Sequence, residues 1–373
     1  FLPQPITMTR ASAGTRVNSS GLVETVELLG SEQVTNGDFA TDSDWTKGSN
    51  WTISNNEATS DGLIDTYILQ NIVNLDLSKT YQVEVTCTNY TSGSLLPKLG
   101  SSGFETYITS EGSFTYYGSF GTDGTIRFYS SSFIGSIDNV SIKESTKNNL
   151  ARVNYDGTAS SLLVEPQRTN TVTYSEDFTQ SFWLESNAVI TPNDIISPNG
   201  TLTGSLLKGN GSSSFPRIQS VVSSSGQVAL SFFVKKELSD EVTLYISGTG
   251  IGGADSTSAY KYTFSTDSFS KLGGGTADSS ESTSFGNEWV RLDIIYTTTT
   301  ITGLRIYPQY NSTSTDGVYI WGVQLEEGSY ATSYIPTSGS TVTRVQELYS
   351  KTGISNLIGQ TKGTMFIDLN FIN

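Results

Sequence analysis

The stretches Ile137-Asp138-Asn139-Val140-Ser141-Ile142 and Ile320-Trp321-Gly322-Val323-Gln324-Leu325 decide the fold of this 373-residue chain. Both follow the pattern Ile-x-x-Val-x-Ile/Leu, whose β-branched and aliphatic residues are typical of a β-strand. Each stretch closes a unit that opens on Asp-Phe followed by a Trp, at residues 38, 39 and 45 and at residues 177, 178 and 183. The sequence therefore predicts an internal repeat, with the opening and closing segments of each unit adjacent in one sheet.

Between these landmarks the sequence has the pattern of an all-β protein. Thr, Tyr, Phe, Val and Ile favour strands, and Gly, Asn, Asp and Ser favour turns. Strand-like runs occur at residues 66–72, 80–88, 113–120, 125–130 and 136–143, and again at 227–235, 241–247, 259–265, 288–297, 303–310 and 317–325. We therefore predict two tandem antiparallel β-sandwich domains of the jelly-roll kind, with extended connectors.

The segments between the two domains resemble a family of bacteriophage tail-fibre and virion-appendage proteins. The phrase Leu163-Val164-Glu165-Pro166-Gln167-Arg168-Thr169-Asn170 leads into Tyr174-Ser175-Glu176-Asp177-Phe178, as it does in that family. The earlier phrases Thr9-Arg10-Ala11-Ser12 and Ala151-Arg152-Val153-Asn154 and the later Ser333-Tyr334-Ile335-Pro336-Thr337 also match it. The resemblance covers residues 1–26 and about 150–345, and implies a structural, non-enzymatic virion protein.

Residues 31–144 depart from the family pattern and look like an inserted domain similar to jelly-roll carbohydrate-binding modules. The predicted organisation is an extended connector over residues 1–30, the insert over 31–144 and a second connector over 145–170. The second sandwich follows over 171–330. Residues 331–373 are predicted to be a connector and the first strand of a truncated concanavalin-like domain, which starts near Gly363.

Charge and residue content exclude several functions. The formal net charge is −15, which disfavours binding to nucleic acid and to anionic lipid. Histidine is absent, so a Ser-His-Asp or Cys-His nucleophile cannot form within this chain. The single cysteine, Cys87, lies in an alternating run and is predicted to be a small buried hydrophobic residue rather than half of a disulfide.

Sugar binding uses aromatic faces flanked by amides and hydroxyls. The insert offers six candidate rings: Trp45, Trp51, Tyr90, Tyr107, Tyr116 and Tyr117. Because consecutive residues of a strand point to opposite faces, one of Tyr116 and Tyr117 is expected to be exposed. The alternative for each ring is core packing, which is the more frequent role of a Trp near the start of a domain.

The first and last strands of such modules also suggest a structural calcium site. Asn36, Asp38 and Asp138 are candidate oxygen ligands for a structural Ca²⁺. The alternative is that Asn-Gly-Asp forms a turn and that Asp138 is an edge residue with local hydrogen bonds. No other cofactor is expected.

Five arginines lie in the connector phrases: Arg10, Arg16, Arg152, Arg168 and Arg344. We expect them to clamp carboxylates such as Glu24, Asp156 and Glu165 through bidentate pairs that fix a connector to its domain. The alternative is ordinary solvated charge.

Together these features predict an oligomeric virion-surface protein of a bacteriophage, in a tail fibre, tailspike or head fibre. Its expected partners are other virion proteins, further copies of itself in a trimer, and a bacterial surface polysaccharide. Alternatives are a carbohydrate-binding region of a secreted polysaccharide-degrading enzyme and a capsid-decorating protein without a ligand.

Overall fold

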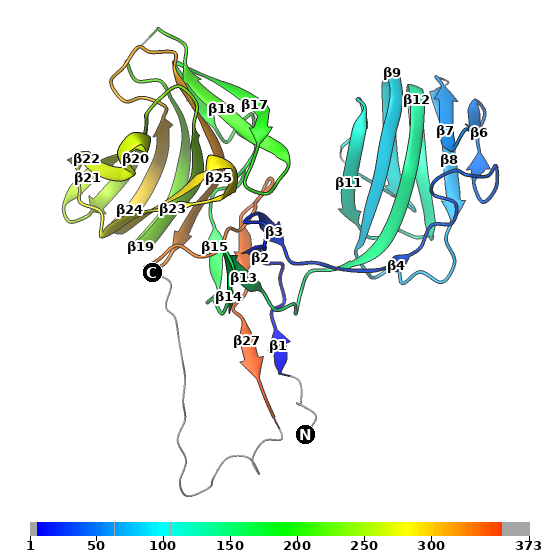
Figure 1. The fold of residues 1–373 in the computed structure, drawn as a ribbon, viewed down its shortest axis with the longest axis horizontal. Helices are drawn as coiled ribbons and strands as arrows, with labels where there is room; N and C mark the ends of the chain where they lie inside the picture. The colour runs from blue at the N-terminus through cyan, green and yellow to red at the C-terminus, as the bar shows by residue number, and fades with distance from the viewer. Residues whose placement is uncertain (1–5, 63, 105, 213, 353–373) are drawn as a thin grey trace, which may run out of the picture. The chain divides into compact units, whose positions relative to one another are not determined.

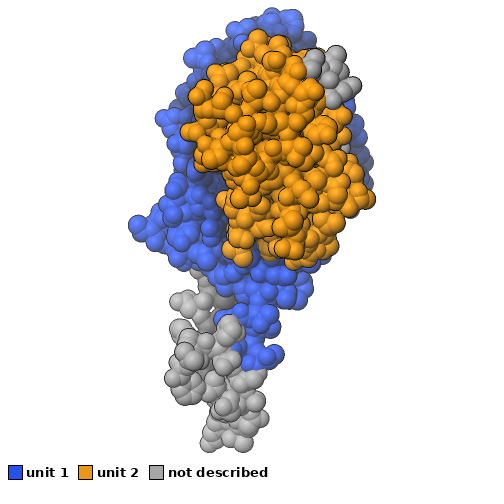
Figure 2. All heavy atoms as spheres, turned by 90° about the vertical axis from the view of Figure 1, so that its right-hand side faces the viewer, with its two compact units in different colours: residues 1–26, 148–373 blue, residues 27–147 orange. Residues whose placement is uncertain are grey.

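The computed structural model describes residues 6–62, 64–104, 106–212 and 214–352. These residues form antiparallel β-sheets, with two 3-10 turns at Phe264–Thr266 and Gly286–Glu288, so the predicted all-β fold class is confirmed. The chain divides into two compact units, which Figure 2 distinguishes by colour: unit 1 comprises residues 1–26 and 148–373, and unit 2 comprises residues 27–147. No helix in the described part of the chain is long and apolar enough to cross a membrane.

Unit 2 is a sandwich built around two long strands, β9 (Tyr81–Leu99) and β12 (Thr125–Thr146), which pair with each other (Figure 1). Register shifts between Ser131 and Ser136 break the β9–β12 ladder, so each strand contributes to both layers. The other strands of unit 2 are β4 (Leu28–Glu32), β5 (Thr46–Lys47), β6 (Trp51–Ser54), β7 (Glu57–Asp61), β8 (Ile64–Asn71), β10 (Ser102–Gly103) and β11 (Gly112–Gly118).

The pairing gives unit 2 two layers with one shared core. One layer has the order β5, β8, first half of β12, second half of β9, β10. The other has the order β6, β7, second half of β12, first half of β9, β11. Alternate residues of both layers, such as Phe128 and Ile137, are fully buried in a single hydrophobic cluster. Cys87 lies in this cluster at 1% exposure, as predicted, and burial raises the pKa of its thiol to about 11.

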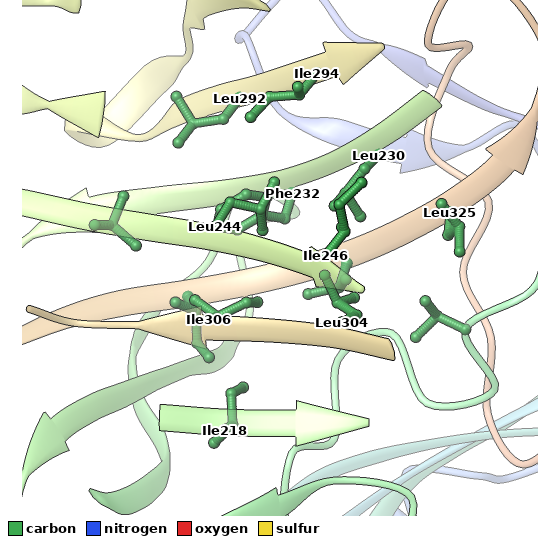
Figure 3. Packing of buried hydrophobic residues seen from close by; sticks show 14 of the residues in the cluster. Ile218, Leu230, Phe232, Leu244, Ile246, Leu292, Ile294, Leu304, Ile306 and Leu325 are labelled. Carbon is green, nitrogen blue, oxygen red and sulfur yellow. The ribbon is translucent and has the colours of Figure 1, made fainter. Parts of the chain in front are cut away.

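The sandwich of unit 1 also contains two long strands, β19 and β24 (Figure 1). They are β16 (Leu184–Ser186), β17 (Ala188–Ile196), β18 (Leu202–Gly209), β19 (Arg217–Lys236), β20 (Glu241–Ile251), β21 (Asp255–Thr263), β22 (Ser268–Gly274), β23 (Ser279–Ser284), β24 (Val290–Tyr307) and β25 (Gly317–Glu327). Figure 3 shows the aliphatic and aromatic side chains of β19, β20, β24 and β25 that gather in its core.

The two sandwiches have the same strand order. In unit 1 one layer is β16, first half of β19, second half of β24, β20, β21. The other layer is β17, β18, β25, second half of β19, first half of β24. The strands in these two orders correspond in both sequence and sheet position, so the internal repeat predicted from the sequence is present. Strands β22 and β23 of unit 1 and β4 of unit 2 are additions to the shared order.

The landmark residues of the repeat make matching contacts. The Trp45 indole donates to the backbone oxygen of Asn36 at 2.9 Å, and the Trp183 indole donates to that of Tyr174 at 2.8 Å. The closing strand meets the opening segment in both units, because the Val140 amide donates to the oxygen of Gly37 and the Val323 amide to that of Ser175. The residue before each valine, Asn139 or Gly322, has a positive φ of 51° or 64°.

The predicted connectors form short antiparallel pairs in unit 1. These are β1 (Thr7–Thr9) with β27 (Leu348–Ser350), β2 (Thr15–Val17) with β3 (Val23–Thr25), β13 (Val153–Asp156) with β14 (Ala159–Leu162), and β15 (Arg168–Asn170) with β26 (Val342–Arg344). Most residues of the predicted connectors, 1–30 and 145–170, belong to the same compact unit as the second sandwich, against which Val23 is buried. The concanavalin-like domain predicted near Gly363 lies outside the described residues.

An arginine cluster, which we define as Arg10, Arg152, Arg344, Glu165 and Glu347, holds these segments together. Arg152 binds both oxygens of Glu347, with Nε–Oε1 at 2.6 Å and Nη2–Oε2 at 2.8 Å, and Arg10 contacts the same carboxylate at 2.5 Å. Glu165 lies 2.8 Å from Arg152 and 3.1 Å from Arg344. All three arginine side chains are at most 1% exposed, so the cluster is part of the interior.

Most of the connector arginines therefore pair with carboxylates, as predicted. Arg16 pairs with Glu24 at 2.7 Å near the surface, as the sequence suggested. Asp156 is exposed and forms no ion pair among the described residues, so this part of the prediction is wrong. Its place is taken by Glu347, which lies 195 residues from Arg152 and was not singled out in the sequence.

Candidate functional site

Three of the six candidate sugar-binding rings are buried in the core of unit 2. Trp45, Trp51 and Tyr116 are 7%, 4% and 8% exposed, respectively. Trp45 contacts Phe39 and Phe128, and Trp51 stacks on Phe133. The prediction that the two tryptophan rings present a face to a sugar is therefore wrong, because both side chains point into the shared core.

The other three rings reach the surface to different extents. Tyr90 is half-buried against Phe133, and its hydroxyl donates to the oxygen of Gly93 at 2.9 Å. Tyr107 is 48% exposed, and Tyr117 is 42% exposed. As expected for neighbours on a strand, Tyr116 points inward and Tyr117 outward.

Tyr117 also has a structural role at the ends of unit 2. Its hydroxyl donates to the carboxylate of Glu27 at 2.9 Å and accepts a bond from Gln82, also at 2.9 Å. The ammonium group of Lys147 lies 3.2 Å from the centre of the Tyr117 ring. Since Glu27 and Lys147 are the first and last residues of unit 2, Tyr117 joins both ends of unit 2 to the β11 edge.

An open pocket of about 480 Å³ lies beside this edge. Its lining combines rings with backbone and hydroxyl groups: Leu99, Ser102, Gly103, Phe104, Thr106, Thr115, Tyr116, Tyr117, Gly118 and Ser119. The volume and the mixture of aromatic and hydroxyl groups are typical of small-molecule sites. Of the six candidate residues, Tyr116 and Tyr117 are among the lining residues, and Trp45, Trp51, Tyr90 and Tyr107 are not.

Phe104 forms one wall of the pocket and was not singled out in the sequence. The centroids of the Phe104 and Tyr116 rings lie 4.8 Å apart, and the angle between the ring planes is 31°. A Cβ on Gly118 would come within 2.8 Å of the Phe104 ring, so only glycine leaves room for it there. The segment after β10 therefore folds over β11, which no local pattern in the sequence indicates.

One of the lining residues carries a buried polar group without a hydrogen-bond partner. The Tyr116 hydroxyl is buried and makes no hydrogen bond among the described residues. Burial raises the pKa of this phenol to about 12, so the group stays protonated at neutral pH. The hydroxyls of Ser102, Thr106 and Ser119 line the same pocket and can donate or accept.

The candidate calcium ligands are engaged in local structure. The Asn36 amide nitrogen donates to the oxygens of Thr41 and Ser43 at 2.7 and 2.9 Å, and its side-chain oxygen accepts from the Thr41 amide. Asp138 accepts from the backbone and side-chain nitrogens of Asn139 at 2.6 and 2.8 Å. Burial, with smaller contributions from the charges of Glu57 and Asp38, raises the pKa of Asp138.

These contacts correspond to the turn-and-edge alternative considered for the sequence. Among the described residues, no group of three or more cysteine or acidic side chains is arranged to hold a metal ion. Calcium binding by Asn36, Asp38 and Asp138 stays a prediction.

No family model matches the sequence, and no curated protein does. Among solved structures, a chain described as truncated AlyQ with CBM32 and alginate lyase domains is 12% identical, covers 86% of this chain and 99% of its own, and has a TM-score of 0.20. A chain from a structure of infectious bursal disease virus Gt strain is 10% identical, covers 95% of this chain and 80% of its own, and has a TM-score of 0.10. At these TM-scores neither similarity supports an inference about this protein.

Proposed function

We propose that this chain is a non-catalytic virion protein of a bacteriophage that attaches to host-surface glycans through the pocket beside β11. The observation that carries the attachment is the pairing of the Phe104 and Tyr116 rings at 4.8 Å in a pocket of about 480 Å³ rimmed by hydroxyl groups. The Phe104 ring can accept the C–H surface of a pyranose, while the hydroxyl groups of the lining are suited to its polar groups.

The virion assignment is supported by the connector phrases of the sequence and by what they do in the structure. The arginines and the glutamate of the phrases that resemble phage appendage proteins, Arg10, Arg152 and Glu165, belong to the buried arginine cluster. These phrases therefore describe a packed frame into which unit 2 is inserted. A single shallow pocket gives modest affinity, so attachment would rely on many copies in an oligomer and on a particle.

Binding to host-surface glycans tests the attachment. The full chain, Phe104→Ala and Tyr107→Ala are applied to an array of oligosaccharides from bacterial surface polysaccharides. We expect Phe104→Ala to weaken binding by roughly tenfold or more, because it removes one wall of the pocket. Tyr107→Ala is the matched control, since this exposed ring follows in the same segment and does not line the pocket.

Two results would contradict the attachment. If the wild-type chain binds none of the oligosaccharides, this protein is not a glycan-binding protein. If Phe104→Ala binds as well as the wild type while keeping its melting temperature, the pocket is not the site. Mass spectrometry of purified particles tests virion membership separately, and absence of the chain from them would overturn that part.

A further inference from the structure

A short motif recurs on equivalent strands of the two sandwiches. Arg127-Phe128-Tyr129 lies in β12, and Arg305-Ile306-Tyr307 lies in β24. In each case the middle residue is buried in the core, so the arginine and the tyrosine face outward from the same layer. The two motifs occupy the same place in the strand order, between β8 and β9 in unit 2 and between β19 and β20 in unit 1.

The two arginines differ in whether a nearby carboxylate neutralises their charge. Arg127 lies 3.1 Å from the carboxylate of Asp123, so its charge is balanced. Arg305 has no carboxylate partner among the described residues and lies over the Tyr245 ring at 4.8 Å. The neighbouring Arg217 likewise pairs with no described carboxylate and donates to the side chain of Gln219 at 2.9 Å.

Around these two arginines, aromatic rings form a continuous row on the outer face of unit 1. Neighbouring ring centroids lie 5.2 Å apart for Phe215 and Tyr310, 5.1 Å for Tyr310 and Tyr307, and 6.3 Å for Tyr307 and Tyr245. Arg217 lies 5.9 Å from the centre of the Tyr307 ring. We call Phe215, Arg217, Tyr245, Arg305, Tyr307 and Tyr310 the cationic aromatic face.

This face combines rigid and accessible groups. Tyr307 is only 3% exposed and forms the base of the row, while Phe215 is 37% exposed and Tyr245, Tyr310 and both arginines are half-buried. Lys261 on the next strand is neutralised by Glu241 at 3.2 Å, so the excess positive charge belongs to the two arginines.

We infer that the cationic aromatic face is a second binding site and that its ligand is an acidic saccharide. The rings provide a surface for sugar C–H groups, and a guanidinium held over a ring is oriented to bind a carboxylate through two parallel hydrogen bonds. The chain carries a net charge of −15, so an acidic polysaccharide is repelled by most of the molecule. Two uncompensated arginines beside four rings are the feature that attracts one.

Affinity electrophoresis of the full chain tests this site. Native gels contain polygalacturonate, the same polymer with its carboxylates methyl-esterified, or hyaluronan. We expect retardation by the two acidic polymers and little by the ester, which keeps the sugar ring and loses the charge. Arg217→Gln and Arg305→Gln should each weaken retardation by roughly tenfold, as expected for the loss of a charge-assisted hydrogen bond.

Arg127→Gln in unit 2 is the matched control, because it removes the same motif's arginine where Asp123 already balances it. It should migrate like the wild type. Equal retardation by the acidic and esterified polymers, or no retardation by either acidic polymer, would overturn the inference. So would retention of binding by an Arg217→Gln/Arg305→Gln double variant with an unchanged melting temperature. Because the cationic aromatic face and the pocket beside β11 share no residue, Phe104→Ala should leave this retardation unchanged.

Discussion

Unit 1 and unit 2 contain the same sandwich, yet the outer face next to the closing strand differs completely between them. In unit 2 this face carries Asp138, which is partly exposed and bonded to Asn139. At the equivalent place in unit 1, Trp321 is 1% exposed and packs against Phe233 and Tyr334. The difference arises because the connector segments of unit 1 cover this face, with Val23 and Tyr334 completing a second small hydrophobic core.

The comparison shows that one strand order can serve as an inserted module or as part of a frame. The pattern Ile-x-x-Val-x-Ile/Leu specifies the inward-facing residues of both closing strands. The outward-facing residues then decide whether the sheet meets solvent or another segment of the chain.

The largest effect is expected when Trp321 of unit 1 is replaced by aspartate, the residue at the equivalent position 138 of unit 2. Trp321→Asp removes a buried indole and places a carboxylate between Phe233 and Tyr334. We expect a loss of at least about 5 kcal/mol in the free energy of unfolding of unit 1, from cavity formation and burial of an unpaired charge. Hydrogen exchange that reports on each unit separately measures it, and Asp138→Ala, which should cost less than about 1 kcal/mol, is the control.

The second test concerns the arginine cluster, which unit 2 lacks. Glu347→Gln keeps the shape of the side chain and leaves Arg10 and Arg152 without their shared counter-charge. Removing one partner from a buried ion pair typically costs about 3–5 kcal/mol, so unit 1 should unfold at much lower denaturant concentration while unit 2 does not.

Glu24→Gln provides the control for this change. The Arg16–Glu24 pair has side chains that are 28% and 35% exposed, and an exposed pair of this kind contributes less than about 1 kcal/mol. If Glu347→Gln and Glu24→Gln have equal small effects on unit 1, the cluster is not what holds the connector segments in place.

How much of this arrangement could be predicted depends on how far apart the interacting residues lie along the sequence. The landmark tryptophans and the closing strands belong to short phrases that occur twice along the chain, so the repeat could be found from the sequence. The Arg152–Glu347 pair joins residues 195 positions apart, and Phe104 reaches Tyr116 through a loop whose path depends on the space above Gly118. Those contacts depend on tertiary packing, which hydrophobic periodicity does not report.

Acid should weaken unit 1 through Glu165. Burial alone would raise the pKa of this carboxyl group, but Arg344, Arg152 and the bonds from Ser333 outweigh burial and lower the pKa from 4.5 to about 2. A depressed pKa contributes stability that is complete above the unfolded value and is lost as the pH falls through the folded one. We expect this loss, about 3 kcal/mol, between about pH 5 and pH 2.

Denaturant unfolding at a series of pH values measures this dependence, with Glu165→Gln as the comparison. The variant should be less stable at neutral pH and should have a flatter profile below about pH 5, because its side chain cannot take up a proton. Glu176 and Asp293 have pKa values raised by burial, which acts in the opposite direction, and the variant leaves both unchanged. Identical profiles for the wild type and the variant would contradict a charged Glu165 in the cluster.

The smallest expected effects come from exchanging Asn139 and Gly322, the residues with left-handed backbone conformation that precede Val140 and Val323 in the closing strands. Asn139 and Gly322 have φ values of 51° and 64°, and asparagine tolerates this region better than most residues. At Gly322 a Cβ would lie 3.0 Å from Phe233 and 3.3 Å from Tyr334, whereas Asn139 is exposed. Gly322→Asn should therefore destabilise unit 1 by about 1–2 kcal/mol, and Asn139→Gly should change unit 2 by less than about 0.5 kcal/mol. Equal effects of the two exchanges in thermal unfolding would mean that backbone conformation, and not the cover over Trp321, sets the residue at this position.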